Sequence, residues 1–136
     1  MNFLSESKPL FIQIPKFNCD FMKNKNNVLA DVAKSALVNL SNEMGFYFYT
    51  DFNRPLGVFA RSLQEFISAL KRVDIKSIEF HAKRKDFSNW ISNTLKDKYL
   101  ATNLTNMSNL HGEELRKKII ETVESRYNNL AKALSH

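Results

Sequence analysis

Only three glycines and three prolines interrupt the 136 residues of this chain, and their scarcity restricts the folds that it can adopt. A β-sandwich needs such residues at roughly every tenth position, because tight turns join its many short strands. The apolar fraction of 43% and the charged fraction of 25% are typical of a globular domain. The composition therefore predicts one mainly α-helical domain, long enough to bury a core without a metal or a disulfide.

Apolar residues recur at helical spacing in most of the chain after residue 26. The first such segment predicts a helix over residues 27–44, with Asn26 or Asn27 as its N-cap and Gly45 closing its last turn in a left-handed conformation. Its expected buried stripe is Leu29, Val32, Ala33, Ala36, Leu37, Leu40 and Met44. The last helix is expected over residues 113–134, and its stripe is Leu115, Ile119, Val123, Tyr127, Leu130 and Leu134.

Residues that cap helices mark the shorter helices in between. Ser62 and Glu65 form a capping box, in which Ser62 accepts an N–H three residues on and Glu65 reaches back to the Ser62 N–H. The next helix is expected over residues 75–84, beginning near Asp74 or Ser77.

Two further aspartates precede apolar residues at helical spacing. Asp86 is expected to cap a helix over residues 87–95, in which Trp90 is largely buried. Asp97 is expected to cap one more helical turn. Residues 102–109 are rich in Asn, Thr and Ser, and they predict a loop.

One segment breaks the helical pattern. Residues 46–50 read Phe-Tyr-Phe-Tyr-Thr, which is typical of a strand, and residues 51–57 have the chemistry of a turn. Residues 58–60 can return as a second strand. The expected fold is therefore a compact helical domain of four to six helices with a short aromatic β-hairpin near residues 46–60.

The N-terminal residues 1–25 show no helical period. They contain a β-prone run, residues 10–14, followed by Pro15. We interpret residues 1–25 as an arm that packs on the core or on a partner, and residues 26–136 as a single helical domain.

Cysteine, histidine and hydropathy patterns limit the classes of function. The single cysteine, Cys19, cannot form an internal disulfide, which favours a reducing compartment. No apolar run is long enough to span a bilayer and no signal peptide is evident, so a cytoplasmic protein without a membrane partner is expected. His81, His111 and His136 lie in no metal-ligand spacing, and no nucleotide or cofactor motif is present. We therefore expect no metal and no cofactor, and the sequence indicates no catalytic residue.

The densest polar segment surrounds His81. On a helix Ser77 and His81 share a face, and a candidate polar site would bring Ser77, His81, Arg84 and Asp86 together beside Trp90. The structural alternative is that His81 is half-buried and hydrogen-bonded, Arg84 pairs with a carboxylate and Asp86 caps a helix.

Basic residues are concentrated after residue 45. Residues 46–136 carry fifteen Lys/Arg against ten Asp/Glu, and the whole chain has a net charge of +6. A basic surface of this kind favours an anionic partner such as RNA, the ribosome or DNA. The candidate binding residues are Lys71, Arg72, Lys76, Lys83, Arg84, Lys85, Arg116, Lys117 and Lys118.

Three hypotheses for function follow. The first is a non-enzymatic binding or adaptor protein whose basic face meets RNA, the ribosome or DNA, with the aromatics of residues 46–49 available for stacking. The second is a protein–protein or homodimer module that docks through the aromatic arm at residues 9–22. The third is a small ligand-binding or enzymatic domain around His81, Arg84 and Asp86.

A set of short motifs in order along the chain gives a resemblance. They are Phe46–Thr50, Gly57, Ser62–Phe66, Lys76–His81, Asp86-Phe87, Trp90-Ile91, Asp97, Leu100-Ala101 and Gly112–Arg116. From about residue 45 to 130 the chain resembles domain-of-unknown-function family 5752, a family of archaea and some bacteria. The resemblance implies a compact helical domain after a short aromatic segment and an archaeal source, but no activity. The chain departs from the family pattern at Lys85 and Lys96, where glycine is usual.

Overall fold

The computed structural model describes residues 28–107 and 109–135. Residues 28–36 are helical. The elements that follow are a 3₁₀ turn η2 (Asn42–Met44), strands β1 (Phe46–Asp51) and β2 (Arg54–Ala60), and helices α2 (Leu63–Arg72), α3 (Ile75–Arg84), α4 (Asp86–Asn93), α5 (Lys98–Thr105) and α6 (Gly112–Leu134). The fold is thus mainly helical with one antiparallel hairpin, which confirms the predicted class. The arm at residues 1–25, its docking segment 9–22 and the proposed caps at Asn26 and Asn27 lie outside the described residues.

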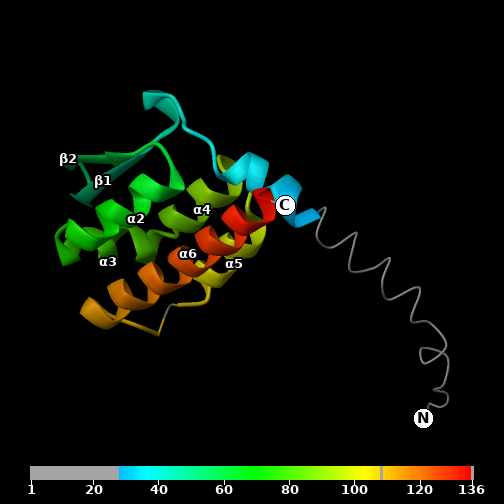
Figure 1. Cartoon of the computed structure of the whole chain (residues 1–136). Helices are drawn as coiled ribbons and strands as arrows, with labels where there is room; N and C mark the ends of the chain where they lie inside the picture. Colours follow the sequence, from blue (N-terminus) through cyan, green and yellow to red (C-terminus); the bar gives the residue numbers. More distant parts are fainter. Residues whose placement is uncertain (1–27, 108, 136) are drawn as a thin grey trace, which may run out of the picture.

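Helices α2 and α3 lie between the hairpin and α6 (Figure 1). The hairpin packs against them, with β1 on α3 and β2 on α2, and α6 runs along both of these helices. Helices α4 and α5 pack on each other, and they contact α3 and α6 respectively. Helix α3 therefore contacts the hairpin, α4 and α6.

Alternation along β1 builds the centre of the core. Phe46 and Phe48 point inward and are buried, whereas Tyr47 between them is exposed. The Phe46 ring lies 5.7 Å from Phe66 and 5.6 Å from Trp90, both nearly edge to face, a favoured arrangement for aromatic pairs. This cluster joins the hairpin to α2 and α4.

The first helix is shorter than predicted. The helical residues end at 36, after which the chain is extended, and the Leu40 N–H donates to the Arg61 carbonyl at 2.7 Å. Leu37 and Leu40 remain half-buried against the core, but Met44 is exposed. The prediction of a helix therefore holds for the first half of residues 27–44. Beyond it, the Leu40 N–H binds the Arg61 carbonyl and not a carbonyl of its own helix.

Gly45 does not close a helix in the left-handed region, because its φ is −70°. A Cβ at this position would lie 2.8 Å from the Ala60 carbonyl oxygen. The glycine is needed because the two ends of the hairpin approach closely here.

Three of the expected caps are confirmed. Ser62 accepts from the Glu65 N–H, Asp74 from the Lys76 N–H and Asp97 from the Leu100 N–H. The capping box is shifted by one residue, since Glu65 accepts from the Arg61 N–H instead of that of Ser62.

The predicted Asp86 cap is wrong. Lys85 precedes α4 in the left-handed conformation with φ 65°, and Asp86 is already helical, without a capping bond to the backbone. One left-handed residue thus joins α3 to α4, and the Asp86 side chain turns back towards α3. Lys96 also has a positive φ, 63°.

Several boundaries differ from the predictions. Strand β2 begins at Arg54, so the turn is confined to Phe52 and Asn53. Asn53 has a φ of 63°, a conformation that asparagine tolerates well. Residues 102–105, expected in a loop, belong to α5, and α4 ends at Asn93. The sequence could not locate these ends because polar residues at helix termini and in loops are of the same types.

Helix α6 was predicted to within one residue. Its buried residues are Leu115, Ile119, Val123 and Leu130, whereas Tyr127 is half-buried and Leu134 is exposed. The stripe therefore faces the core until the last turn.

Candidate functional site

The polar residues around His81 form a closed network, which we call the polar cluster: Tyr49, His81, Arg84 and Asp86. His81 Nε2 accepts the Tyr49 backbone N–H at 2.8 Å, and His81 Nδ1 lies 2.8 Å from Asp86 Oδ2. Because Nε2 is the acceptor, the ring proton lies on Nδ1 and is donated to Asp86. Arg84 Nε donates to the same Asp86 oxygen at 3.0 Å.

The surroundings keep His81 neutral. Burial lowers the pKa of His81 below its ordinary value of 6.5, while the hydrogen bond and the charge of Asp86 raise it and the charge of Arg84 lowers it. Protonation would also place a second N–H against the Tyr49 N–H, which removes that hydrogen bond.

The polar cluster joins three elements: β1 through Tyr49, α3 through His81 and Arg84, and α4 through Asp86. Both ring nitrogens of His81 have protein partners, so neither is free to take a proton from a substrate. The arrangement favours the structural interpretation of His81 and Arg84 over a catalytic one, although Asp86 plays a different part from the expected cap.

Ser77 and Trp90 do not join this cluster. Ser77 is buried, and its Oγ is without a hydrogen-bond partner among the described residues. Trp90 is buried in the aromatic core, and its Nε1 donates to the Met44 carbonyl at 2.9 Å. Of the five residues of the candidate polar site, the structure therefore brings together His81, Arg84 and Asp86.

A hollow of about 380 Å³ borders the polar cluster, and all four residues of the cluster line it. Its walls also include the hairpin turn and α3, where Phe52 and Phe80 meet edge to face with centroids 5.5 Å apart. The Arg84 guanidinium lies beside both rings, 4.8 Å from the Phe52 centroid and 5.1 Å from that of Phe80. Phe52 is 67% exposed. The hollow thus offers an aromatic ring and a guanidinium group to solvent.

Four of the nine predicted basic residues are held by the protein itself. Lys71 pairs with Glu124, Arg84 with Asp86, and Lys85 Nζ donates to the Thr105 carbonyl at 3.1 Å. Arg116 is the fourth.

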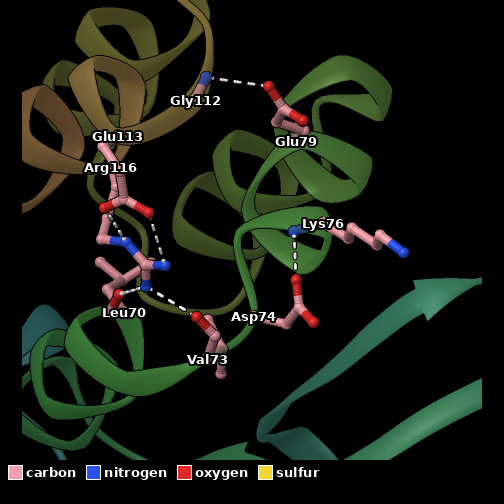
Figure 2. Close-up of polar contacts among 8 residues, drawn as sticks. All are labelled: Leu70, Val73, Asp74, Lys76, Glu79, Gly112, Glu113 and Arg116. Carbon is pink, nitrogen blue, oxygen red and sulfur yellow. Dashed lines mark hydrogen bonds and ion pairs between the residues drawn. The ribbon is translucent and has the colours of Figure 1, made fainter.

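Arg116 fastens α6 to the corner between α2 and α3 (Figure 2). Its Nη1 donates to the carbonyls of Leu70 and Val73 at 2.8 and 2.7 Å, and its other nitrogens bind Glu113. These carbonyls end α2 and have no helical N–H to accept, so the arginine satisfies them. Arg116 is thus part of the fold, and Figure 2 shows the Lys76 side chain pointing away from it.

The other five basic residues are exposed, and their side chains have no hydrogen bond or ion pair within residues 28–107 and 109–135. They are Arg72, Lys76, Lys83, Lys117 and Lys118. Two of them, Lys76 and Lys83, lie two helical turns apart on α3, so they project from one side of that helix.

Lys76 and Lys83 border a hollow of about 660 Å³, which we call the lysine groove. It lies among α3, the end of α5, the following loop and α6. Its floor is apolar and includes buried Phe87, Leu104 and Ile119, and Lys85 reaches it as well. Glu79 also lines it, but its carboxylate accepts the Gly112 N–H at 2.8 Å.

The outer side of the hairpin carries exposed aromatic rings. Tyr47 and Phe59 stack with centroids 5.1 Å apart and planes at 11°. Together with Phe52 at the turn, whose ring packs edge to face on Phe80 of α3, they form what we call the aromatic face.

Sequence reasoning missed the groove and the two arginine contacts that fasten α6 to other elements. Arg126 donates to both carboxylate oxygens of buried Asp97, at 2.8 and 3.0 Å. Arg116, which binds the end of α2, also pairs with Glu113 on its own helix. The i, i+3 spacing of Glu113 and Arg116 was a usable signal. No local signal links Arg126 to Asp97, which lies on a different element.

The described part of the chain contains neither a metal-binding cluster nor a membrane-spanning helix. Within 28–107 and 109–135, no three His, Cys, Asp or Glu side chains come close enough together to hold a metal ion. None of the helices in this part of the chain combines the length and the apolar character that crossing a bilayer requires.

Comparison with known proteins places the chain in a family. The sequence model of the family of unknown function DUF5752 matches residues 43–135. The chain belongs to this family, and the match begins at the 3₁₀ turn before the hairpin and runs nearly to the end of α6. No curated protein and no solved structure matches the chain significantly.

Proposed function

We propose that this protein is a non-enzymatic binding protein that takes single-stranded RNA along the aromatic face and the exposed cations of α3. The observation that supports the proposal most is the position of two kinds of group on neighbouring elements. Exposed rings lie on the hairpin, exposed lysines lie on α3, and β1 packs directly against α3. Single-stranded RNA requires both kinds, because its bases stack and its phosphates need cations.

The aromatic face supplies the stacking surface. Phe52 is 67% exposed and Tyr47 43%, although burial of large rings normally stabilises a fold. Arg84 lies over the Phe52 ring and can add a cation–π contribution to a stacked base. The polar cluster holds Arg84 in this position through Asp86.

The cations of α3 supply the phosphate contacts. Lys76 and Lys83 are exposed and free of protein partners in the described part of the chain. By contrast, Lys71, Lys85 and Arg116 are engaged within the fold. Of the nine predicted basic residues, the proposal therefore assigns the phosphate contacts to Lys76 and Lys83 of α3.

The test is fluorescence anisotropy with labelled oligouridylate of about twelve nucleotides, at about 50 and 200 mM salt. Phe52→Ala is expected to weaken binding by roughly 5- to 100-fold, because one stacked base is lost. Lys83→Ala should lower the slope of log affinity against log salt by about one. Lys98→Ala, at the opposite end of α5 from the groove, is the matched control and should change neither value.

Two outcomes would contradict the proposal. One is affinity that does not fall as salt rises, since phosphate binding releases counterions. The other is equal binding to duplex DNA and to oligouridylate, because exposed rings cannot stack on paired bases. Single-stranded DNA of the same length tests whether the 2′-hydroxyl is recognised. We further propose a cytoplasmic location, which the single Cys19 supports.

A further inference from the structure

We propose that the lysine groove binds a small amphiphile with one anionic head group, a carboxylate or a phosphate on an apolar tail. This ligand differs in class from the RNA of the proposed function. The groove is separate from the aromatic face, although Lys76 and Lys83, which line the groove, serve in both proposals.

The floor of the groove is suited to an apolar tail. Phe87, Leu104 and Ile119 come from three helices and are buried, and half-buried Met107 and Leu110 of the loop after α5 line the groove beside them. The hollow of about 660 Å³ lies within the range of pockets for small molecules, roughly 300–1,000 Å³. It is too small for a docked protein domain, whose interface spreads over a wider surface.

The rim of the groove is suited to an anion. Lys76, Lys83 and Lys85 contribute three ammonium groups, and the only carboxylate among its lining residues, that of Glu79, is bound to the Gly112 N–H. Lys85 donates one hydrogen bond to the Thr105 carbonyl. An ammonium group has three donors, so two remain for a ligand.

This combination excludes other small ligands. A cation would be repelled by three lysines, and a neutral amphiphile would gain nothing from their charge. A purely polar anion would not use the floor. Apolar area and positive charge are both matched only by an amphiphilic anion.

The test is isothermal titration calorimetry with four twelve-carbon ligands, each below its critical micelle concentration. Dodecanoate and dodecyl phosphate should bind saturably, one per chain. The ratio of their dissociation constants tells which head group the groove prefers. Dodecanol and dodecyltrimethylammonium should bind about tenfold more weakly or not at all, because they lack the charge-assisted hydrogen bond. Equal binding of all four, or no saturable binding, would overturn the inference.

Variants locate the site. Lys83→Glu should weaken dodecanoate binding about tenfold or more, whereas the control Lys98→Glu should not. Ala82→Phe places a ring in the groove and should reduce dodecanoate binding while leaving oligouridylate affinity unchanged. Phe52→Ala should have the opposite pattern, so the two proposals can fail separately.

Folding of each variant is checked by its urea unfolding curve. The head-group series uses the unaltered protein, so it decides the inference even if Ala82→Phe does not fold. Binding of an acidic amphipathic peptide, without binding of dodecanoate, would assign the groove to a protein partner and overturn the inference.

Discussion

The polar cluster and the lysine groove lie on neighbouring sides of α3 and both contain charged residues, yet they differ in how their polar groups are satisfied. In the polar cluster His81, Arg84 and Asp86 bind one another, and Tyr49 binds His81. In the groove the lysines face an apolar hollow. The comparison teaches that a dense polar sequence can stabilise the fold on one side of a helix and leave charges free for a ligand on the other.

The largest effect is expected at Trp90, which the sequence grouped with the polar cluster. Trp90→Ala should lower the free energy of unfolding by roughly 3–5 kcal/mol, because a buried ring is removed from the core. Urea unfolding measures it. Trp90→Phe keeps most of the packing and loses the hydrogen bond to Met44, so it should cost less. An unchanged stability in Trp90→Ala would mean that the ring is not part of the core.

The next effect is expected at His81. His81→Phe preserves an aromatic ring but leaves the Tyr49 N–H without its acceptor, and it should cost about 1–3 kcal/mol. The same urea unfolding experiment measures it. A loss below about 0.5 kcal/mol, the range of ordinary surface changes, would show that the polar cluster does not stabilise the fold.

The protonation of His81 gives a third prediction. Its pKa is lowered in the folded protein, so the unfolded chain binds a proton first as the pH falls below 6.5. Stability should be constant above this pH and decrease below it by up to about 1.4 kcal/mol per pH unit, until the folded pKa is reached. His81→Phe should flatten the profile between about pH 5 and 7. A wild-type profile that rises towards acid would contradict the lowered pKa.

The smallest effect is expected at the two left-handed lysines. Lys96→Gly should stabilise the protein by roughly 0.5–1 kcal/mol, because glycine adopts a positive φ without steric cost. Lys85→Gly should gain less, since it also loses the hydrogen bond to Thr105. Lys96→Ala is the control that removes the charge and keeps the strain. Equal gains at both positions would mean that the Lys85 bond contributes nothing.

Local patterns in the sequence predicted most of the fold. The caps at Ser62, Asp74 and Asp97 and the apolar stripe of α6 depend on residues close in the chain, so their spacing was sufficient. The family resemblance was informative in another way: it implies glycine at the positions of Lys85 and Lys96, and both residues have a positive φ.

The errors arose where distant residues decide the structure. The first helix ends early because Leu40 binds the Arg61 carbonyl, and Gly45 is needed for its approach to Ala60. Asp86 has the sequence signature of a cap, but that signature is the same whether the carboxylate turns to a backbone N–H or to His81. The lysine groove combines residues of several helices, and no single segment indicates it.

The most direct test of the division between the two sides of α3 compares two variants in two assays. The double variant Lys76→Glu, Lys83→Glu should lose oligouridylate affinity by at least about tenfold while its unfolding free energy stays within about 0.5 kcal/mol of wild type. His81→Phe should retain the affinity and lose stability. Unchanged affinity in the lysine variant, together with weakened binding in an equally stable His81→Phe protein, would contradict the account and place the functional surface at the polar cluster.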